Sequence, residues 1–176
     1  PKQPKNYRPI ALLNSLYKLY ASILQKRLEG GIDQDLQSTQ FGFRRARSTA
    51  QPITLVRRII DATEASNFEK AFLLFLDWEK AFDKINQKKL IQALSRLGIQ
   101  GKMLRILGTF YEKPSFRIKD PDGRSTQRPQ KTGIRQGCPI SPYLCILTFS
   151  YVPGYSSQKV ATKQHGIRRP MGLPSQ

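Results

Sequence analysis

An unbroken apolar run that ends in an aspartate is the sequence feature that most constrains how this chain can fold. Residues 71–76 have the sequence AFLLFL, and Asp77 follows them directly. A run this short, flanked by charged residues, is typical of a strand buried on both faces of a sheet. Its final carboxylate would lie at the rim of the sheet, where open α/β sheets bind their ligands. The run therefore predicts a buried strand that presents Asp77 as a functional residue.

The large positive charge of the chain predicts a polyanionic partner. Its 30 Lys and Arg residues outnumber 12 Asp and Glu residues, which gives a formal net charge of +18. This excess is greater than solubility requires and is typical of proteins that bind nucleic acid. Binding to a membrane surface ranks last, because the sequence has no long basic amphipathic helix. No apolar run approaches the roughly 20 residues of a membrane-spanning helix, so no membrane partner is expected.

The two cysteines indicate packing rather than metal binding. Cys138 and Cys145 have no further Cys and no clustered His beside them, which does not match a zinc site. We expect both to pack as small apolar groups in a reducing compartment. The sequence shows no secretory signal, so an intracellular location, nuclear or cytoplasmic, is expected. Because the chain starts at Pro1 rather than Met, we expect it to be part of something longer.

Apolar spacing predicts helices on both sides of the run. The first is expected over residues 13–28, with an end at Gly30-Gly31. Ser48 or Thr49 is expected to cap a second helix, whose apolar face carries Ile53, Val56 and Ile60. Further helices are expected around residues 90–97 with a stop at Gly98, over residues 101–111, and over residues 144–149. Between the last two, residues 114–131 predict a β-hairpin that turns at Pro121-Asp122-Gly123.

An arginine-rich loop precedes the second helix. Arg44, Arg45 and Arg47 lie there beside Phe41 and Phe43. Arginines just before a helix N-terminus can hold phosphate, since guanidinium groups and free amides point the same way. Arg-rich loops are also commonly just solvated, so the pattern alone leaves both interpretations open. Arg47 is the first candidate for a phosphate contact.

A second motif, GIRQGCPISPY at residues 133–143, predicts a fixed loop. Its glycines and prolines restrict the backbone, and Gly137 would allow close backbone approach. Gln136 offers a donor and an acceptor for a sugar hydroxyl or a base edge. Asp83, by contrast, precedes a helical pattern, and we favour a structural role for it at a helix start or turn. Asp77 is therefore the catalytic candidate.

Four segments resemble, in the right order, the motifs of reverse transcriptases of non-LTR (LINE-type) retrotransposons. The resemblance implies an α+β fold, a partial right-hand polymerase with fingers and the first part of the palm, in which helices pack on a small antiparallel sheet. This fold would cover residues 1–150, and residues 151–176 would be a basic, disordered tail. An RNA template, a DNA primer and dNTP are the implied partners of this RNA-directed DNA polymerase. The matching segments are residues 6–28, 40–49, 72–85 and 133–143.

The same resemblance implies roles for individual residues. Asp77 would hold the catalytic Mg²⁺ ions with the backbone carbonyl of Trp78. Phe82 would be the steric gate under the sugar. The nucleotide pocket would contain Gln136, Gly137 and Arg47, and nucleic-acid contacts would come from Arg44, Arg45 and Arg135.

The chain departs from the family pattern in its carboxylates. Nucleotidyl transfer uses two metal ions about 4 Å apart, and magnesium requires several oxygen ligands. The family supplies adjacent aspartates after the second motif, whereas this chain has no Asp-Asp pair and no acid after Asp122. The chain could be an excerpt or decayed copy, a second chain could complete the palm, or it could serve as a non-catalytic basic RNA/DNA-binding module. We favour the first and expect no activity from the chain alone.

Overall fold

The computed structural model describes residues 3, 7–66, 70–120 and 123–151. Residues 152–176, which make up most of the predicted tail, and Pro121-Asp122 of the predicted turn lie outside the described residues. Within these residues the helices are α1 (Ser15–Ile32), the 3₁₀ turn η2 (Asp33–Asp35), α2 (Ala50–Ala65), α3 (Ala81–Lys84), α4 (Gln87–Arg96), α5 (Gly101–Phe110) and α6 (Ser141–Ser150). The strands are β1 (Ser115–Phe116), β2 (Lys119–Asp120), β3 (Gly123–Arg124) and β4 (Arg128–Pro129).

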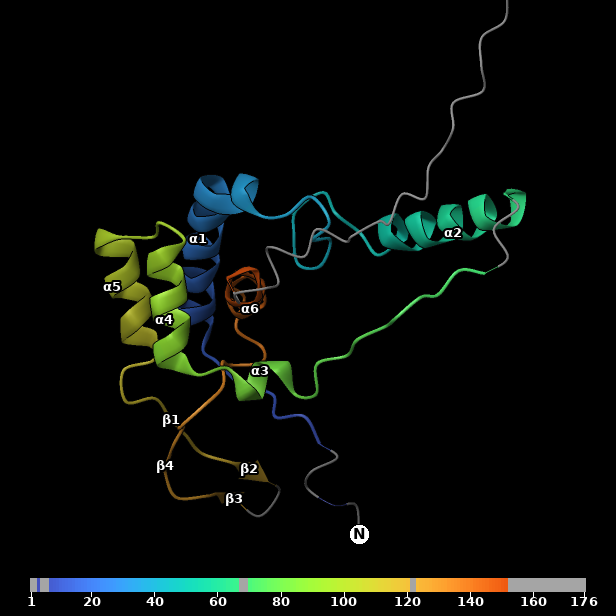
Figure 1. Cartoon of the computed structure of the whole chain (residues 1–176). Coiled ribbons are helices and arrows are strands. Elements are labelled where there is room, and N and C mark those ends of the chain that lie inside the picture. The colour runs from blue at the N-terminus through green and yellow to red at the C-terminus, as the bar shows by residue number, and fades with distance from the viewer. Residues whose placement is uncertain (1–2, 4–6, 67–69, 121–122, 152–176) are drawn as a thin grey trace, which may run out of the picture.

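Helix α6 forms the centre of the hydrophobic core. Helix α4 packs against both α5 and α6, and α1 lies beside them (Figure 1). Leu144 and Leu147 of α6 are fully buried, as are Leu90 and Leu94 of α4. Both cysteines are free and buried beside them, which confirms that they pack as apolar groups; burial raises the pKa of the Cys145 thiol to about 11. The core therefore forms between helices.

Two side-chain caps and one glycine define three of the core helix ends. Asn14 accepts a hydrogen bond from the Tyr17 N–H at 2.7 Å and so begins α1. Asn86 does the same for α4, accepting from the Lys89 N–H at 3.0 Å. The chain leaves α4 at Gly98, as predicted, with φ of +87°.

Helices α1 and α6 have different bounds from those expected. The predicted end at Gly30-Gly31 is wrong, because α1 continues through both glycines to Ile32. Leu28 and Ile32 on either side are buried, and this burial offsets the cost of about 1 kcal/mol that each helical glycine carries. Helix α6 begins at Ser141 rather than at residue 144, with a proline in its first turn. Proline is tolerated there because its N–H would have no partner in any case.

The predicted hairpin is present as a small antiparallel sheet in two parts. Strand β1 pairs with β4, and β2 pairs with β3 nearer the turn. The described residues of β1, β3 and β4 are exposed, and no residue of the described strands belongs to the core. The expected packing of helices on this sheet is therefore not observed, because the helices bury their apolar faces against one another. None of the helices described is both long and apolar enough to cross a lipid bilayer.

The prediction of a buried strand at residues 71–76 is wrong. These residues are extended but pair with no described strand, and Phe72 and Leu74 are 92% and 83% exposed. A strand needs a neighbour for its backbone hydrogen bonds, and the described part of the chain places none beside it. Helix α2 lies apart from the helical core and buries no residue fully, so its predicted apolar face is at most half-buried (Figure 1). We call α2 and residues 70–78 together the arm.

The start of α2 also differs from the prediction. The helix begins at Ala50, but neither Ser48 nor Thr49 caps it through its side chain. Instead, the Ser48 N–H donates to the side-chain oxygen of Gln51 at 3.1 Å, so a residue of the helix accepts the hydrogen bond from the residue before it.

Candidate functional site

The loop at residues 133–140 lies against the turn formed by α3, so the two motifs at residues 72–85 and 133–143 meet. The Gly133 N–H donates to the Ile85 carbonyl at 2.7 Å, and the Ile134 N–H donates to the Phe82 carbonyl at 2.9 Å. The Gln136 Nε2 donates to the Asp83 Oδ1 at 3.0 Å. Segments that are far apart in sequence thus share backbone and side-chain hydrogen bonds at this junction.

Two glycines allow this junction to close. Gly133 has φ of +84°, and a Cβ at that position would lie 2.9 Å from the Asp83 carbonyl oxygen. Gly137 has φ of +104°, and its Cβ would lie 2.9 Å from the Ala11 carbonyl oxygen. Both positions require glycine, for backbone conformation and for space. The close approach expected at Gly137 is made by the chain's own N-terminal segment, whose Ala11 N–H donates to the Gln136 carbonyl at 2.7 Å.

Asp83 has a structural role in the first turn of a short helix, as expected. It lies in α3, and Asn86 rather than Asp83 caps the following helix. Its carboxylate holds the side chain of Gln136 instead. The sequence analysis did not find this partnership, because nothing in the two motifs indicates which acid faces the loop.

Asp77 and Trp78 lie where the arm joins the core. Asp77 is exposed and has no hydrogen bond or ion pair with another described residue. The Trp78 ring packs on Phe149 of α6, with ring centroids 5.0 Å apart. Trp78 and Phe149 also line an open hollow of about 640 Å³ beside α4, which Asp77 does not line. The structure therefore joins Gln136 to Asp83 but brings neither of them into contact with Asp77.

The carboxylates of the described residues do not form a metal site. No group of three or more His, Cys, Asp or Glu side chains in the described ranges could hold a metal ion. Glu79, close to Asp77 in sequence, accepts a hydrogen bond from the Lys84 Nζ at 2.8 Å, which lowers the pKa of its carboxyl. Asp83 is held by Gln136. The donors of this part of the chain therefore do not fit a divalent ion on their own.

Phe82 is covered by the arginine loop, residues 41–47. The rings of Phe43 and Phe82 meet edge to face, with centroids 6.2 Å apart and an angle of 86°. The Arg47 guanidinium lies 5.7 Å from the centroid of the Phe41 ring, and Arg45 is exposed. Phe43 is thus part of the candidate site, although sequence analysis identified it only as a neighbour of arginines.

Arg44 differs from the other two arginines because it is buried. Its side chain is only 7% exposed and pairs with Asp33, with Nη2 to Oδ2 at 2.9 Å and Nε to Oδ1 at 3.1 Å. Further bonds run to the backbone carbonyls of Asp33, Gln37 and Gln40. The nucleic-acid contact by Arg44 stays a prediction, and the structure does not favour it, because the donors of Arg44 are already used inside the protein.

Arg135 also faces the protein. Its Nη1 donates to the Tyr17 hydroxyl at 2.9 Å, and its guanidinium lies over the Tyr17 and Tyr111 rings at 5.5 and 6.0 Å. Burial, together with a hydrogen bond involving Cys138, raises the pKa of Tyr17 to about 12. Arg135 thus ties the second motif to α1.

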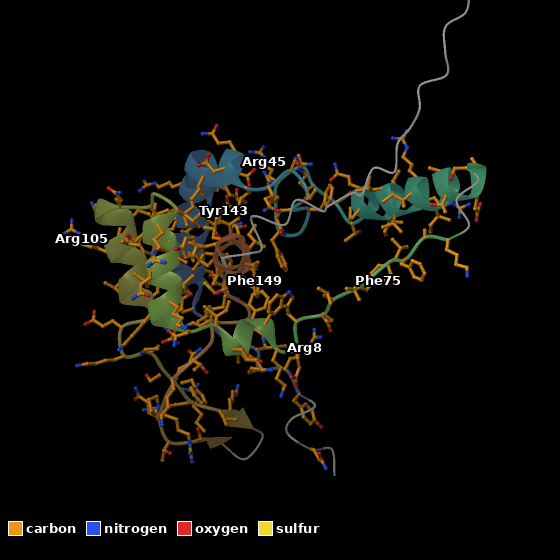
Figure 2. The ribbon with its side chains drawn as sticks, in the orientation of Figure 1. Arg8, Arg45, Phe75, Arg105, Tyr143 and Phe149 are labelled. Carbon is orange, nitrogen blue, oxygen red and sulfur yellow. The ribbon has the colours of Figure 1, made fainter. Side chains whose placement is uncertain are left out.

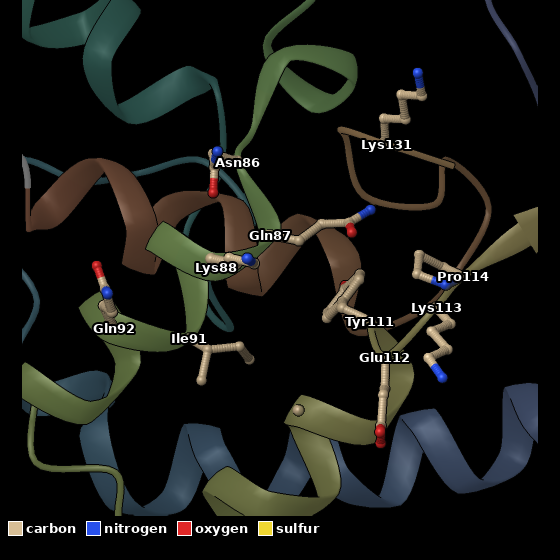
Figure 3. A pocket seen from close by; sticks show the side chains of 11 residues that line it. Asn86, Gln87, Lys88, Ile91, Gln92, Tyr111, Glu112, Lys113, Pro114 and Lys131 are labelled. Carbon is tan, nitrogen blue, oxygen red and sulfur yellow. The ribbon is translucent and has the colours of Figure 1, made fainter. Parts of the chain in front are cut away.

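A basic hollow adjoins this junction, since Gln87, which lines the hollow, donates to the Gly133 carbonyl at 2.9 Å. It has a volume of about 800 Å³ and lies between α4, the end of α5 and the start of the hairpin (Figure 3). Lys88, Lys113 and Lys131 line it, together with Glu112. None of the residues predicted for the site lines it.

Comparison with known proteins identifies the family. The family described as reverse transcriptase (RNA-dependent DNA polymerase) matches residues 1–166, continuing past the predicted boundary at residue 150. The probable RNA-directed DNA polymerase from transposon BS of Drosophila melanogaster is 30% identical over 146 residues, covering 81% of this chain and 16% of that protein. The RNA-directed DNA polymerase from mobile element jockey of the same species is 30% identical over 159 residues, covering 89% and 17%.

A third relative comes from another insect. The retrovirus-related Pol polyprotein from type-1 retrotransposable element R2 of Popillia japonica is 30% identical over 145 residues, covering 81% of this chain and 20% of that protein. The chain thus spans a fifth or less of the length of these three relatives. Members of the matched family use divalent metal ions and bind RNA templates and nucleotides. The prediction from the four motifs is confirmed, and the chain belongs to the reverse transcriptase (RNA-dependent DNA polymerase) family, with relatives among the enzymes of non-LTR retrotransposons.

Proposed function

We propose that this chain forms the fingers and the first part of the palm of a polymerase that extends a DNA primer along an RNA template. The observation that carries the proposal is the family match over residues 1–166, which includes both predicted motifs. Two of the relatives above are named RNA-directed DNA polymerases. The net charge of +18 supports a nucleic-acid partner.

The nucleotide pocket is proposed to lie at the junction of the two motifs. The side-chain amide nitrogen of Gln136 donates to Asp83. The side-chain oxygen Oε1 of Gln136 is then left to accept from a sugar hydroxyl or a base. Gly137 would line the same pocket, and Phe82 would exclude a 2′-hydroxyl. The Phe82 ring is in edge-to-face contact with Phe43, and a ring held by such a contact can discriminate by shape better than a mobile one. Arg47, with Arg45 beside it, would contact phosphate.

Asp77 is proposed to supply one carboxylate for Mg²⁺, with the Trp78 carbonyl beside it. Its carboxylate is exposed and without a partner among the described residues, so it is free to bind an ion. Two ions need more oxygen ligands than one aspartate provides. The remaining carboxylates would come from residues outside this chain. The chain alone is therefore expected to bind a primed template without extending it.

A second candidate function is binding without catalysis. The lysines of the basic hollow and the absence of any acid after Asp122 favour it, because both raise affinity for a polyanion and neither requires metal. In that case the affinity would depend steeply on salt concentration, while added catalytic groups would have no effect.

Primer extension distinguishes the two functions. The chain would be mixed with a DNA-primed RNA template, dNTP and Mg²⁺, with and without a separate palm fragment that carries adjacent aspartates. We expect binding by the chain alone and extension only with the fragment. Asp77→Ala should abolish extension, whereas Asp35→Ala, at an exposed acid of η2, should preserve it. Extension by the chain alone would refute the missing-carboxylate argument, and binding without extension in both mixtures would favour the second function.

A further inference from the structure

We propose that Arg44 is a positioning residue, which Asp33 clamps so that the arginine loop holds Arg47 and Phe43 in place for the ligand. The proposal rests on the proposed function for the identity of that ligand, a primed template or a triphosphate. It assigns to Asp33, an acidic residue in a basic nucleic-acid-binding protein, a favourable role in binding.

The first argument is that the guanidinium of Arg44 is fully used. It has five N–H groups, and the structure gives it five acceptors. Nε and Nη2 donate to the two Asp33 carboxylate oxygens at 3.1 and 2.9 Å, in the bidentate geometry typical of strong pairs. Nη2 also donates to the Asp33 carbonyl at 2.7 Å. Nη1 donates to the carbonyls of Gln37 and Gln40 at 2.8 and 3.4 Å.

The second argument is that the clamp is anchored in the helical core. Asp33 directly follows α1, and its Oδ1 also accepts a hydrogen bond from the Tyr143 hydroxyl at 3.3 Å. Tyr143 belongs to α6 and has no exposed surface. Burial and the nearby Asp33 carboxylate raise the pKa of Tyr143, so its hydroxyl stays protonated as a donor. The loop is thus tied to two core helices through one carboxylate.

The third argument is that the loop needs such a restraint. Phe43 and Ala46 have φ of +58° and +57°, a left-handed conformation that costs free energy for residues other than glycine. They flank Arg44 and Arg45 and determine the direction of the rings and guanidinium groups around them. Without the clamp, the loop can relax toward cheaper backbone conformations. The contact of Phe43 with Phe82 and the position of Arg47 would then be lost.

The Asp33→Asn variant tests the proposal, because the clamp and simple electrostatics predict opposite changes in nucleic-acid affinity. Removing a negative charge should strengthen nucleic-acid binding if only electrostatics matters. The clamp predicts the opposite, a loss of about tenfold in affinity for a DNA-primed RNA, the size expected when one charge-assisted hydrogen bond is lost. Asp35→Asn removes the same charge from an exposed neighbour in η2 and should leave binding unchanged or tighter. Equal or tighter binding by Asp33→Asn would overturn the proposal.

Arg44→Lys separates positioning from direct contact. Lysine keeps the charge but not the planar fork, so direct phosphate contact predicts near-normal binding and the clamp predicts a loss similar to that of Arg44→Ala. Asp33→Asn combined with Arg47→Ala should lose less affinity than the sum of the two single losses, because the Arg47 contact can be lost only once. Additive losses, or normal binding by Arg44→Lys, would contradict positioning through Arg47.

Hydrogen exchange tests the clamp without any ligand. Amides of residues 41–47 should exchange faster in Asp33→Asn, whereas those of α4 and α6 should keep their protection. Unchanged exchange in the loop would refute the clamp. If the unaltered chain binds no nucleic acid, the proposed function fails, and exchange still decides whether Asp33 and Arg44 order the loop.

Discussion

The core helix α6 and residues 71–76 of the arm are both strongly apolar in sequence, yet they have opposite surroundings. Tyr143 and Leu144 of α6 have no exposed surface, whereas Phe75 and Leu76 of the arm are each 79% exposed. Figure 2 shows Tyr143 inside the helical core and Phe75 on the extended segment away from it. Helix α4 and its neighbours cover α6, whereas residues 71–76 of the arm are all exposed among the described residues. An apolar run thus indicates that a segment favours burial but not what buries it.

The largest expected difference between the two regions is in the cost of removing a leucine side chain. Leu94→Ala should lower the free energy of unfolding by about 2–5 kcal/mol, because it leaves a cavity at a fully buried site of α4. Leu74→Ala in the arm should change it by no more than about 0.5 kcal/mol. Urea unfolding followed by circular dichroism measures both. An equal cost at the two positions would show that residues 71–76 pack against something in solution.

Glycines give the next contrast. Gly133→Ala should destabilise by at least about 1–3 kcal/mol, since φ is positive and the new Cβ would meet the Asp83 backbone. Gly30→Ala is the matched control in α1, where a Cβ meets nothing within 4 Å. It should stabilise by about 0.5–1 kcal/mol. Thermal unfolding of both variants gives the answer, and a neutral Gly133→Ala would indicate that the junction of the motifs is looser than observed.

Exposed apolar side chains in the arm are expected to promote self-association. Phe75→Lys should raise the concentration at which the chain associates by about tenfold, because an exposed extended edge with large apolar groups is a site for pairing between copies. Phe116→Lys changes an aromatic residue of the hairpin that is 44% exposed and serves as control. Sedimentation velocity at several concentrations compares them. Equal effects of both variants would mean that charge alone, and not the arm, controls association.

The smallest expected effect concerns the joint between the two regions. The hydrogen bond from Lys84 lowers the pKa of the exposed Glu79 carboxyl. The pKa of the Glu79 carboxyl is lower in the folded state than in the unfolded state. The pair therefore stabilises the fold fully at pH above the unfolded-state pKa, and this stabilisation is lost as pH falls through the folded-state pKa. NMR titration should find a higher Glu79 pKa in Lys84→Met. An unchanged pKa would mean that the pair does not persist in solution.

The segments that were predicted well from sequence are those stabilised by their own residues. The hairpin around residues 114–131 and the stop of α4 at Gly98 depend on local turns, and both are present. The end of α1 and the apolar run before Asp77 were predicted wrongly, because their conformation depends on neighbours that are distant in sequence. Arg44 illustrates the same limit within the candidate site: its residue type suggested phosphate, and its partner Asp33 made it internal.

By itself, the sequence determined the family, the basic character and the positions of two motifs, since these depend on residue types and their order. The tertiary structure alone decided that Asp83 holds Gln136, that Arg44 is clamped while Arg47 remains on the loop, and that α6 rather than residues 71–76 fills the core. The physical reason is that burial and hydrogen-bond partners are properties of pairs of segments. A side chain that could bind a ligand if it were exposed becomes part of the protein's own packing once a carboxylate or a helix lies beside it.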